Sequence, residues 1–142
     1  MDYSIPVNTE CVKEFNVKPE HSALNIGSGT VNVLSTPSAI AFVENTALEC
    51  VEKFLPENYT TVGVEVNIKH LNPAPIGSKV KVKVRVISVN DRKIVFRTEV
   101  HWNNILILEG THVRYIVNKE KFLKKIRKLE NAKEKQSSND VS

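Results

Sequence analysis

Four polar side chains interrupt the apolar patterns of this chain in positions that suit acid–base or anion-binding chemistry. Glu44 lies in an apolar stripe of helical spacing, and His70 ends a run of alternating apolar residues. His112 and Arg114 share the apolar face of a later run. Charged groups on buried faces are costly unless they are paired, and catalytic groups are often found in such interiors. A Glu, a His and an Arg in one interior therefore form a candidate functional set.

Each of these residues also has a purely structural interpretation. Glu44 could be paired with a Lys, an Arg or a backbone donor, or reach solvent at the edge of its stripe. His70 could lie at an exposed strand end, and a bulge could turn His112 and Arg114 outward. No HxH, HExxH or Cys partner indicates a metal site, and no GxSxG motif indicates a serine hydrolase. We expect neither a metal nor a cofactor.

The element that carries Glu44 is predicted to be one long helix. Thr36 suits the N-cap and Pro37 the first helical position, and Pro56 ends the pattern. Between them six apolar residues recur every three or four positions, namely Ile40, Val43, Ala47, Leu48, Val51 and Phe54. Glu44 belongs to the same face of the helix, which is why its charge needs an explanation.

After residue 56 the period of the apolar residues changes from 3.6 to 2, which predicts strands. In the first run we expect one face to hold Val62, Val64, Val66, Ile68 and His70, and the other to hold Thr61, Gly63, Glu65, Asn67 and Lys69. Residues 79–86 alternate basic residues with valine.

Turns at 90–93 and 103–104 delimit two further strands, 94–102 and 105–117, and a short first strand is expected near 12–17. The order is therefore one strand, one long helix and four antiparallel strands. This order predicts an α+β fold in which one helix covers one face of the sheet. The uncovered edge makes a homodimer the expected assembly.

The composition fits one domain and argues against several classes of protein. A chain of 142 residues is long enough for one core, and it has no 18-residue apolar run that would span a membrane. Its first residues, MDYSIPVNTE, lack the apolar segment of a secretion signal. Cys11 and Cys50 form no CxxC pair, so we expect two reduced thiols in a cytoplasmic protein.

The formal net charge of +4 comes from the C-terminal segment alone. Residues 1–117 hold twelve basic and twelve acidic residues, whereas residues 118–142 hold eight basic and four acidic ones. With a neutral body and no zinc-finger or RNA-binding motif, no nucleic-acid partner is expected. We predict one domain over 1–122 and a basic polar helix or tail over 123–142, whose end we expect to be disordered. A thin apolar stripe marks its helix, formed by Phe122, Ile126 and Leu129.

Over about residues 12–122 the chain resembles the hot-dog fold thioesterases, and among them the fluoroacetyl-CoA thioesterase-like family. The resemblance is carried by STP at the start of the predicted helix, with Glu44 eight residues after Thr36. Two further segments carry it, TVGVEVNIKHLNPAPIG (61–77) and EGTHVRYIVNKEKF (109–122). The resemblance implies an antiparallel sheet wrapped around one long central helix, with an acyl-CoA site at the seam between two subunits.

The resemblance also implies roles for individual residues. Thr36, Glu44 and His70 would form the catalytic group, with Glu44 orienting His70 or helping to activate the attacking group. Gly63 and Arg114 would recognise the acyl group, and we assign His112 to substrate binding with them. Thr36 could attack the thioester with His70 as its base, or His70 and Glu44 could activate water directly. Free N–H groups at the helix start would stabilise the oxyanion.

The expected function is therefore hydrolysis of a short- or medium-chain acyl-CoA to free acid and CoA. The alternative is a module that binds acyl-CoA without turnover. The fluoroacetyl-specific enzyme has aromatic lid residues ahead of the helix, whereas this chain has NIGSGT there, so we expect a different acyl group. Hydration is disfavoured because HLNPAP lacks the Asp of the hydratase motif and has its His before Asn-Pro.

Overall fold

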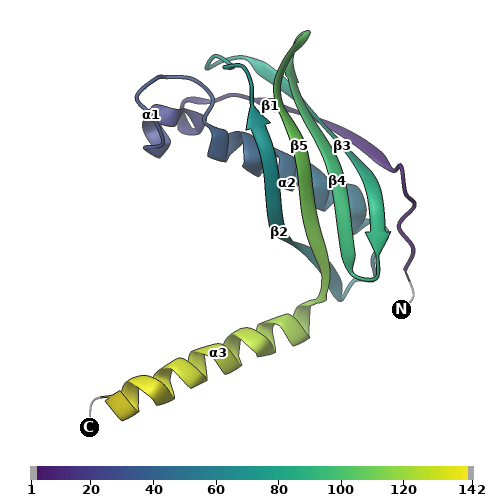
Figure 1. The fold of residues 1–142 in the computed structure, drawn as a ribbon, viewed down its shortest axis with the longest axis vertical. Helices are drawn as coiled ribbons and strands as arrows, with labels where there is room; N and C mark the ends of the chain where they lie inside the picture. Colours follow the sequence, from purple (N-terminus) through teal and green to yellow (C-terminus); the bar gives the residue numbers. More distant parts are fainter. Residues whose placement is uncertain (1–2, 141–142) are drawn as a thin grey trace.

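The computed structural model describes residues 3–140, in which a five-stranded antiparallel sheet packs on one long helix (Figure 1). The elements are β1 (Glu10–Asn16), η1 (Pro19–His21), α1 (Ala23–Ile26), α2 (Thr36–Glu52), β2 (Tyr59–His70), β3 (Lys79–Asn90), β4 (Lys93–Trp102), β5 (Ile105–Asn118) and α3 (Lys119–Asp140). The strands lie in the order β1-β3-β4-β5-β2, so β1 and β2 are the two edges of the sheet. The predicted α+β arrangement of a sheet around a central helix is confirmed.

The core lies between the sheet and α2. The alternating run on β3 behaves as expected, because Val80, Val82, Val84 and Val86 are fully buried while the basic residues between them are exposed. From α2 the core takes Ala39, Val43, Ala47 and Val51, all of them fully buried. Burying this apolar surface is the main force that holds the helix against the sheet.

The start of α2 differs from the sequence prediction in one detail that affects the site. Ser35, not Thr36, is the N-cap, and its side chain accepts a hydrogen bond from the Ser38 N–H at 3.1 Å. Pro37 therefore occupies the second helical position, where its missing N–H costs little. Because Ser35 caps the helix, the hydroxyl of Thr36 is available for another partner.

One flank of α2 is less buried than the predicted stripe implied. Ile40, Glu44 and Leu48 are each only half-buried, whereas Phe42 and Cys50 on the other side are buried. The buried face of α2 is therefore rotated, relative to the predicted apolar stripe, away from Glu44 and toward Phe42 and Cys50. Glu44 lies at the edge of the core rather than inside it, which is one of the structural interpretations open from the sequence.

Strand β2 contains an irregularity that shifts its two faces. Its pairing with β5 changes register between Gly63 and Glu65, so that Val64 is an extra residue. Beyond this bulge Val66 and Ile68 share the half-buried face with His70, as predicted. Before it the predicted faces are exchanged: Thr61 is buried and Gly63 faces α2, while Val62 and Val64 turn outward. The two-residue alternation of the sequence gives no sign of the extra residue, so the bulge could not be predicted from it.

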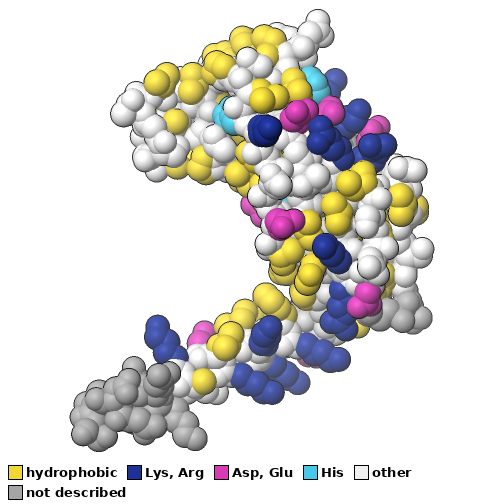
Figure 2. Space-filling model, in the orientation of Figure 1, with side chains coloured by type: hydrophobic (Ala, Val, Ile, Leu, Met, Phe, Trp, Pro, Cys, Tyr) yellow, Lys and Arg dark blue, Asp and Glu magenta, His cyan; other side chains and the backbone are white. Residues whose placement is uncertain are grey.

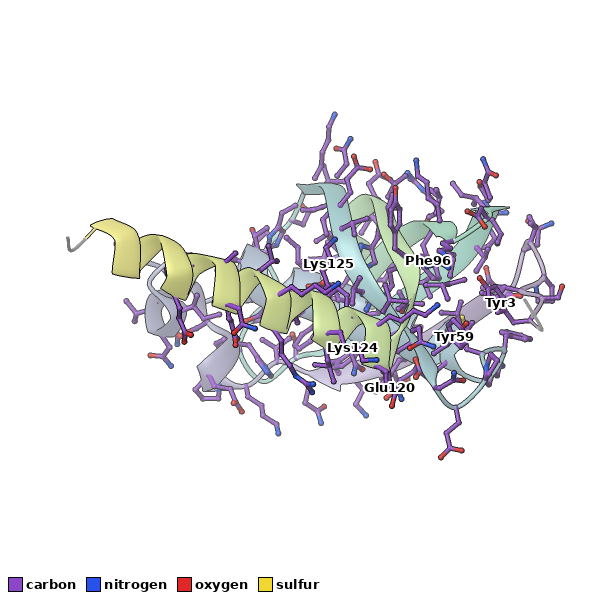
Figure 3. All side chains as sticks on the ribbon, turned by 90° about the horizontal axis from the view of Figure 1, so that it is seen from below. Tyr3, Tyr59, Phe96, Glu120, Lys124 and Lys125 are labelled. Carbon is purple, nitrogen blue, oxygen red and sulfur yellow. A yellow bond between two sulfur atoms is a disulfide. The ribbon has the colours of Figure 1, made fainter. Side chains whose placement is uncertain are left out.

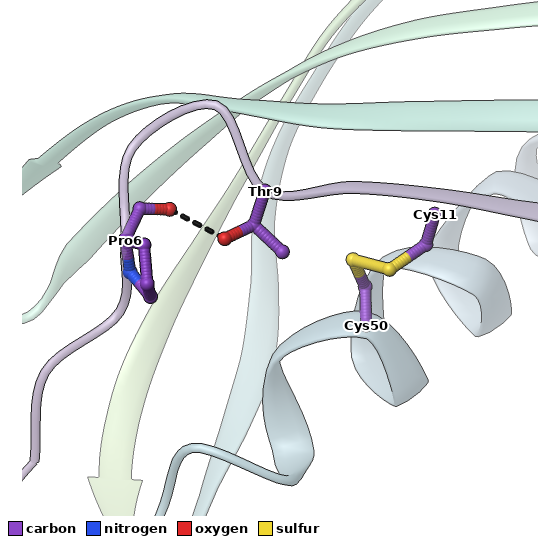
Figure 4. Close-up of a disulfide and its surroundings, with 4 residues drawn as sticks. All are labelled: Pro6, Thr9, Cys11 and Cys50. Atoms are coloured by element: carbon purple, nitrogen blue, oxygen red, sulfur yellow. Dashed lines mark hydrogen bonds between the residues drawn. A yellow bond between two sulfur atoms is a disulfide. The ribbon is translucent and has the colours of Figure 1, made fainter.

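The two cysteines form a disulfide between β1 and α2 (Figure 4). The prediction of two reduced thiols is therefore wrong, because it used only spacing along the chain, and 39 residues separate Cys11 from Cys50. The fold brings their Cα atoms to 5.8 Å, within the range that a disulfide spans. The disulfide ties an edge strand to the central helix. The cytoplasmic location that accompanies reduced thiols stays a prediction.

Helix α3 leaves the sheet at the end of β5 and extends past the edge formed by β2 (Figure 1). It is longer than the short helix predicted and reaches Asp140. The disorder expected at the end of the chain stays a prediction. In the view of Figure 2 hydrophobic side chains line its upper side and Lys and Arg side chains its lower side. Within residues 3–140 no helix combines the length and the apolar character needed to cross a membrane.

Candidate active site

The hydroxyl of Thr36 and the imidazole of His70 are in direct contact. Thr36 Oγ1 lies 2.7 Å from His70 Nδ1, although the two residues come from the start of α2 and the end of β2. Both line a hollow of about 280 Å³ that Leu71, Asn72 and Pro73 also border. A hydroxyl held against an imidazole is the arrangement that nucleophile activation requires. We refer to these two residues as the Thr36–His70 pair.

The environment of His70 favours its neutral form. Burial lowers the pKa of His70 below its ordinary value of 6.5, and the backbone of Asn72 opposes this only in part. Near neutral pH the ring is therefore uncharged, and Nδ1 is free to accept the hydroxyl proton of Thr36. His70 thus has the protonation state of a general base.

The first turn of α2 leaves one backbone donor near the pair. The Ser38 N–H is bound by Ser35, and Pro37 has no N–H. Among the residues that the structure describes, no acceptor binds the Thr36 N–H. A free N–H at a positive helix end is suited to stabilise an oxyanion.

A second group of polar residues lies farther along α2, around the buried Arg114. Its guanidinium donates to Thr61 twice, from Nε to Oγ1 at 2.8 Å and from Nη2 to the carbonyl oxygen at 3.0 Å. Arg114 Nη1 also lies 3.1 Å from His112 Nε2. His112 and Arg114 both face the core, as predicted. The bulge in this pair of strands lies in β2, and it does not turn these two residues outward. We refer to Glu44, Thr61, Gly63, His112 and Arg114 as the Arg114 cluster.

The hydrogen-bond partners of His112 determine which of its ring nitrogens carries the proton. Arg114 can only donate, so His112 Nε2 must accept, and Nδ1 must then donate to the Glu65 carbonyl oxygen at 2.9 Å. His112 is therefore neutral and protonated at Nδ1. Burial lowers its pKa, the Glu65 backbone partly opposes this, and Arg114 lowers it further.

Glu44 and Gly63 border the open side of the same cluster. The Glu44 Oε2 to Arg114 Nη1 distance is 3.9 Å, and the Glu44 side chain is 43% exposed against 7% for Arg114. A Cβ added to Gly63 would lie 2.7 Å from Glu44 Oε2 and 3.3 Å from Arg114 Nη1. The absence of a side chain at position 63 thus leaves room beside the Glu44 carboxylate and the Arg114 guanidinium.

Within one chain the Thr36–His70 pair and the Arg114 cluster are apart. Glu44 follows Thr36 by eight residues of helix, about 12 Å along its axis. On β2, Gly63 pairs with Arg114 of β5, and His70 pairs with Leu108. Arg114 and Leu108 are six residues apart, which corresponds to about 20 Å along a strand. The structure therefore divides the six predicted site residues into two half-sites. It also adds Thr61, whose position on the buried face is hidden in the sequence by the bulge.

Comparison with known proteins identifies the family. The family model described as fluoroacetyl-CoA-specific thioesterase matches residues 17–120, most of the chain. The chain belongs to this family. It is thus an acyl-CoA thioesterase, a thioester hydrolase, as predicted. Among curated proteins, none matches the chain.

Solved structures agree with this assignment at the level of the fold. The fluoroacetyl-CoA thioesterase FlK is 22% identical, with a TM-score of 0.84 over 88% of this chain and 97% of FlK. A hypothetical protein of Thermus thermophilus, a thioesterase superfamily member, is 27% identical, with a TM-score of 0.85 over 92% of this chain and 97% of that one. A hot-dog-like protein of Thermanaerovibrio acidaminovorans is 23% identical, with a TM-score of 0.80 over 87% and 91%. The predicted hot-dog fold is confirmed.

Proposed function

We propose that this thioesterase hydrolyses a short- or medium-chain acyl-CoA at a site that two copies of the chain build together. The observation that carries the proposal is the 2.7 Å contact between Thr36 Oγ1 and His70 Nδ1 beside a free helix N-terminal N–H. This contact combines a hydroxyl, a neutral base and an oxyanion donor, which are the groups that thioester hydrolysis needs.

The contact supports a covalent route. Thr36 Oγ1 would attack the thioester carbonyl carbon while its proton moves to His70 Nδ1, and the Thr36 N–H would stabilise the oxyanion. The C–S bond would then break, and the protonated His70 would return the proton to the leaving sulfur of CoA. Water would hydrolyse the acyl-threonine ester with His70 again as the base. In the alternative route His70 activates water directly and Thr36 positions the substrate.

The separation of the two half-sites supports a homodimer. Strand β2 is a free edge of the sheet, and an edge strand can pair with the same strand of a second copy. Antiparallel pairing of the two β2 strands about an axis midway between Gly63 and His70 would bring His70 of one copy beside Gly63 of the other. The half-exposed flank of α2 with Glu44 lies at this same edge, where a second copy would cover it.

In such a dimer the Arg114 cluster of one copy would bound the acyl group held by the Thr36–His70 pair of the other. Its charged groups and its small residue, Gly63, suit a short or moderately long acyl group better than a long apolar chain, because apolar atoms placed against Glu44 and Arg114 would desolvate them. The region of residues 25–30 has no aromatic side chain, which argues for a substrate other than fluoroacetyl-CoA.

The experiment that tests the proposed function is thiol release from acyl-CoA esters, from acetyl through medium chains. The purified protein is compared with His70→Ala and with His101→Ala, a control that removes a histidine from β4 outside both half-sites. We expect thiol release from a subset of the esters. The rate of release should fall about a hundredfold or more in His70→Ala and should be retained in the control. Acyl-CoA binding without release would instead identify a binding module, and equal rates in all three proteins would exclude His70 as the base.

A further inference from the structure

A groove with a positively charged rim lies between α3 and the outer face of the sheet, on the opposite side of the sheet from α2. Its volume is about 370 Å³, compared with about 280 Å³ for the hollow at the Thr36–His70 pair. It is bounded by β2, β5, the turn between β3 and β4, and the first two turns of α3. We refer to it as the α3 groove.

The floor of the α3 groove is apolar because of the bulge in β2. The bulge leaves Val62 and Val64 on the outer face, where they lie near Tyr115 of β5, and Phe122 of α3 closes the other side. Val64, Tyr115 and Phe122 are all exposed. Two aromatic rings beside exposed aliphatic groups form a surface on which a planar aromatic ligand can stack.

The rim of the groove carries three cations and no carboxylate. Arg92, Lys121 and Lys125 line it, and none of the three side chains lies within ion-pair distance of an acidic group in the described part of the chain. A solvated apolar floor with unpaired cations around it is complementary to an anion that carries an aromatic group.

We propose that the α3 groove binds the nucleotide end of the acyl-CoA substrate, with its phosphates on Arg92, Lys121 and Lys125 and its adenine on Tyr115 and Phe122. This inference rests on the proposed function. The thioester and the phosphates are at opposite ends of coenzyme A, so the phosphates need cations away from the reacting carbonyl. The hollow at the Thr36–His70 pair has no Lys or Arg in its lining.

Arg114, the buried cation of the other half-site, cannot serve this purpose. Arg114 is buried, and its donors are already engaged by Thr61 and His112 beside Glu44. The match to the thioesterase family model ends at residue 120, and Lys121 and Lys125 lie just beyond it. The groove therefore supplies positive charge that the lining of the hollow at the Thr36–His70 pair lacks.

The α3 groove also lies at the end of β2 that the proposed dimer places near the partner's reaction site. Val62 and Val64 are on the stretch of the strand that would pair with the partner's His70 in the proposed dimer. Helix α3 begins beside the start of β2, where the Lys119 N–H donates to the Asn58 carbonyl oxygen. The pantetheine arm would then pass around this end of the sheet, from the partner's Thr36–His70 pair to the groove.

The test compares two substrates with the same acyl group, the acyl-CoA and the acyl-N-acetylcysteamine thioester, which lacks all the phosphates. The double variant Lys121→Glu/Lys125→Glu reverses the charge of the rim. Lys124→Glu is the matched control, since Lys125 and Lys124 are on different sides of α3 and Lys124 is exposed outside the groove (Figure 3). Isothermal titration of CoA alone into each protein measures the groove without any turnover.

We expect the double variant to raise KM for the acyl-CoA about tenfold, with kcat unchanged, and to weaken CoA binding to a similar extent. Lys125→Arg should keep KM near that of the wild type, because it retains the charge. The thioester without phosphates should be hydrolysed equally by all variants.

Three results would overturn this inference. They are an unchanged KM and CoA affinity in the double variant, an equal effect of Lys124→Glu, or an equal loss with the thioester that lacks phosphates. In each of these cases wild-type thioester hydrolysis still stands, so the proposed function is unaffected. If the wild type hydrolyses neither substrate, the proposed function fails, and the titration of CoA still decides whether the groove binds the nucleotide.

Discussion

The backbone of Gly63 faces the Glu44 carboxylate so closely that a Cβ at position 63 would lie 2.7 Å from Glu44 Oε2. Glu44 is the flexible and half-exposed partner of this contact, so its side chain can move away at little cost to the fold. The movement would change its distance from Arg114 Nη1, which is 3.9 Å. The contact therefore links the identity of residue 63 to the geometry of the Arg114 cluster more than to stability.

Gly63→Ala should accordingly reduce kcat/KM about tenfold or more while lowering the free energy of unfolding by about 1 kcal/mol or less. Steady-state kinetics and thermal unfolding of the same preparation measure both quantities. A large loss of thermal stability with normal turnover would show that Gly63 serves the fold and not the substrate.

The pH dependence of hydrolysis should reflect His70. Its pKa is lowered by burial, and the proposed reaction requires the neutral ring, so activity should be lost as the pH falls through that pKa. We expect the acidic limb of the kcat/KM profile to have a midpoint below 6.5, the ordinary value for histidine. Thr36→Ser should preserve this limb, because a serine hydroxyl can contact the same Nδ1 atom. A midpoint well above 6.5 would contradict this assignment of the base.

The Arg114 cluster should contribute strongly to stability. Arg114→Ala would leave His112 Nε2 and both Thr61 oxygens without their donor in a buried place, which costs about 2 to 4 kcal/mol. Arg85→Ala, at an exposed position on β3, is the control and should change stability by about 0.5 kcal/mol or less. Denaturant unfolding measures both, and similar small effects would mean that the guanidinium is not held as described.

Stability should also fall in mild acid because of His112. Its pKa is lower in the folded chain than in the unfolded one, so the unfolded state binds the proton more readily. The contribution is fully present above the ordinary pKa of 6.5 and is lost as the pH falls below it toward the folded value. The slope of unfolding free energy against pH should be smaller in His112→Gln. An equal slope in the variant would assign the effect to other groups.

The elements that follow from local pattern are also those that the sequence predicts well. The buried valines of β3 and the core face of His112 and Arg114 depend only on alternation within one strand. The disulfide between Cys11 and Cys50 and the bulge at Val64 depend on neighbours distant in sequence, so periodicity cannot reveal them. Likewise Ser35 and Thr36 are both good N-caps, and the sequence does not show that Ser35 caps the helix while Thr36 contacts the distant His70.

The division of the site into two half-sites had a signal in the sequence. Eight helical residues correspond to about 12 Å, so Thr36 and Glu44 cannot act on one carbonyl from a single helix. The resemblance to a family groups these residues without saying which copy of the chain supplies each. The strand register of the structure adds the second part of the separation, because it places Gly63 and His70 opposite residues six apart on β5.

The two half-sites predict complementation between inactive chains. His70→Ala disables the Thr36–His70 pair, and Glu44→Gln disables the Arg114 cluster, so each homodimer should lose most of its activity. In a heterodimer one site would combine the intact pair of one chain with the intact cluster of the other, while the second site would carry both defects. Unfolding and refolding an equal mixture should therefore recover roughly a quarter of the wild-type activity. A mixture of two Glu44→Gln preparations is the control. If the mixture of different variants stays as inactive as its components, each site is built by one chain, and the proposed pairing of the β2 strands is wrong.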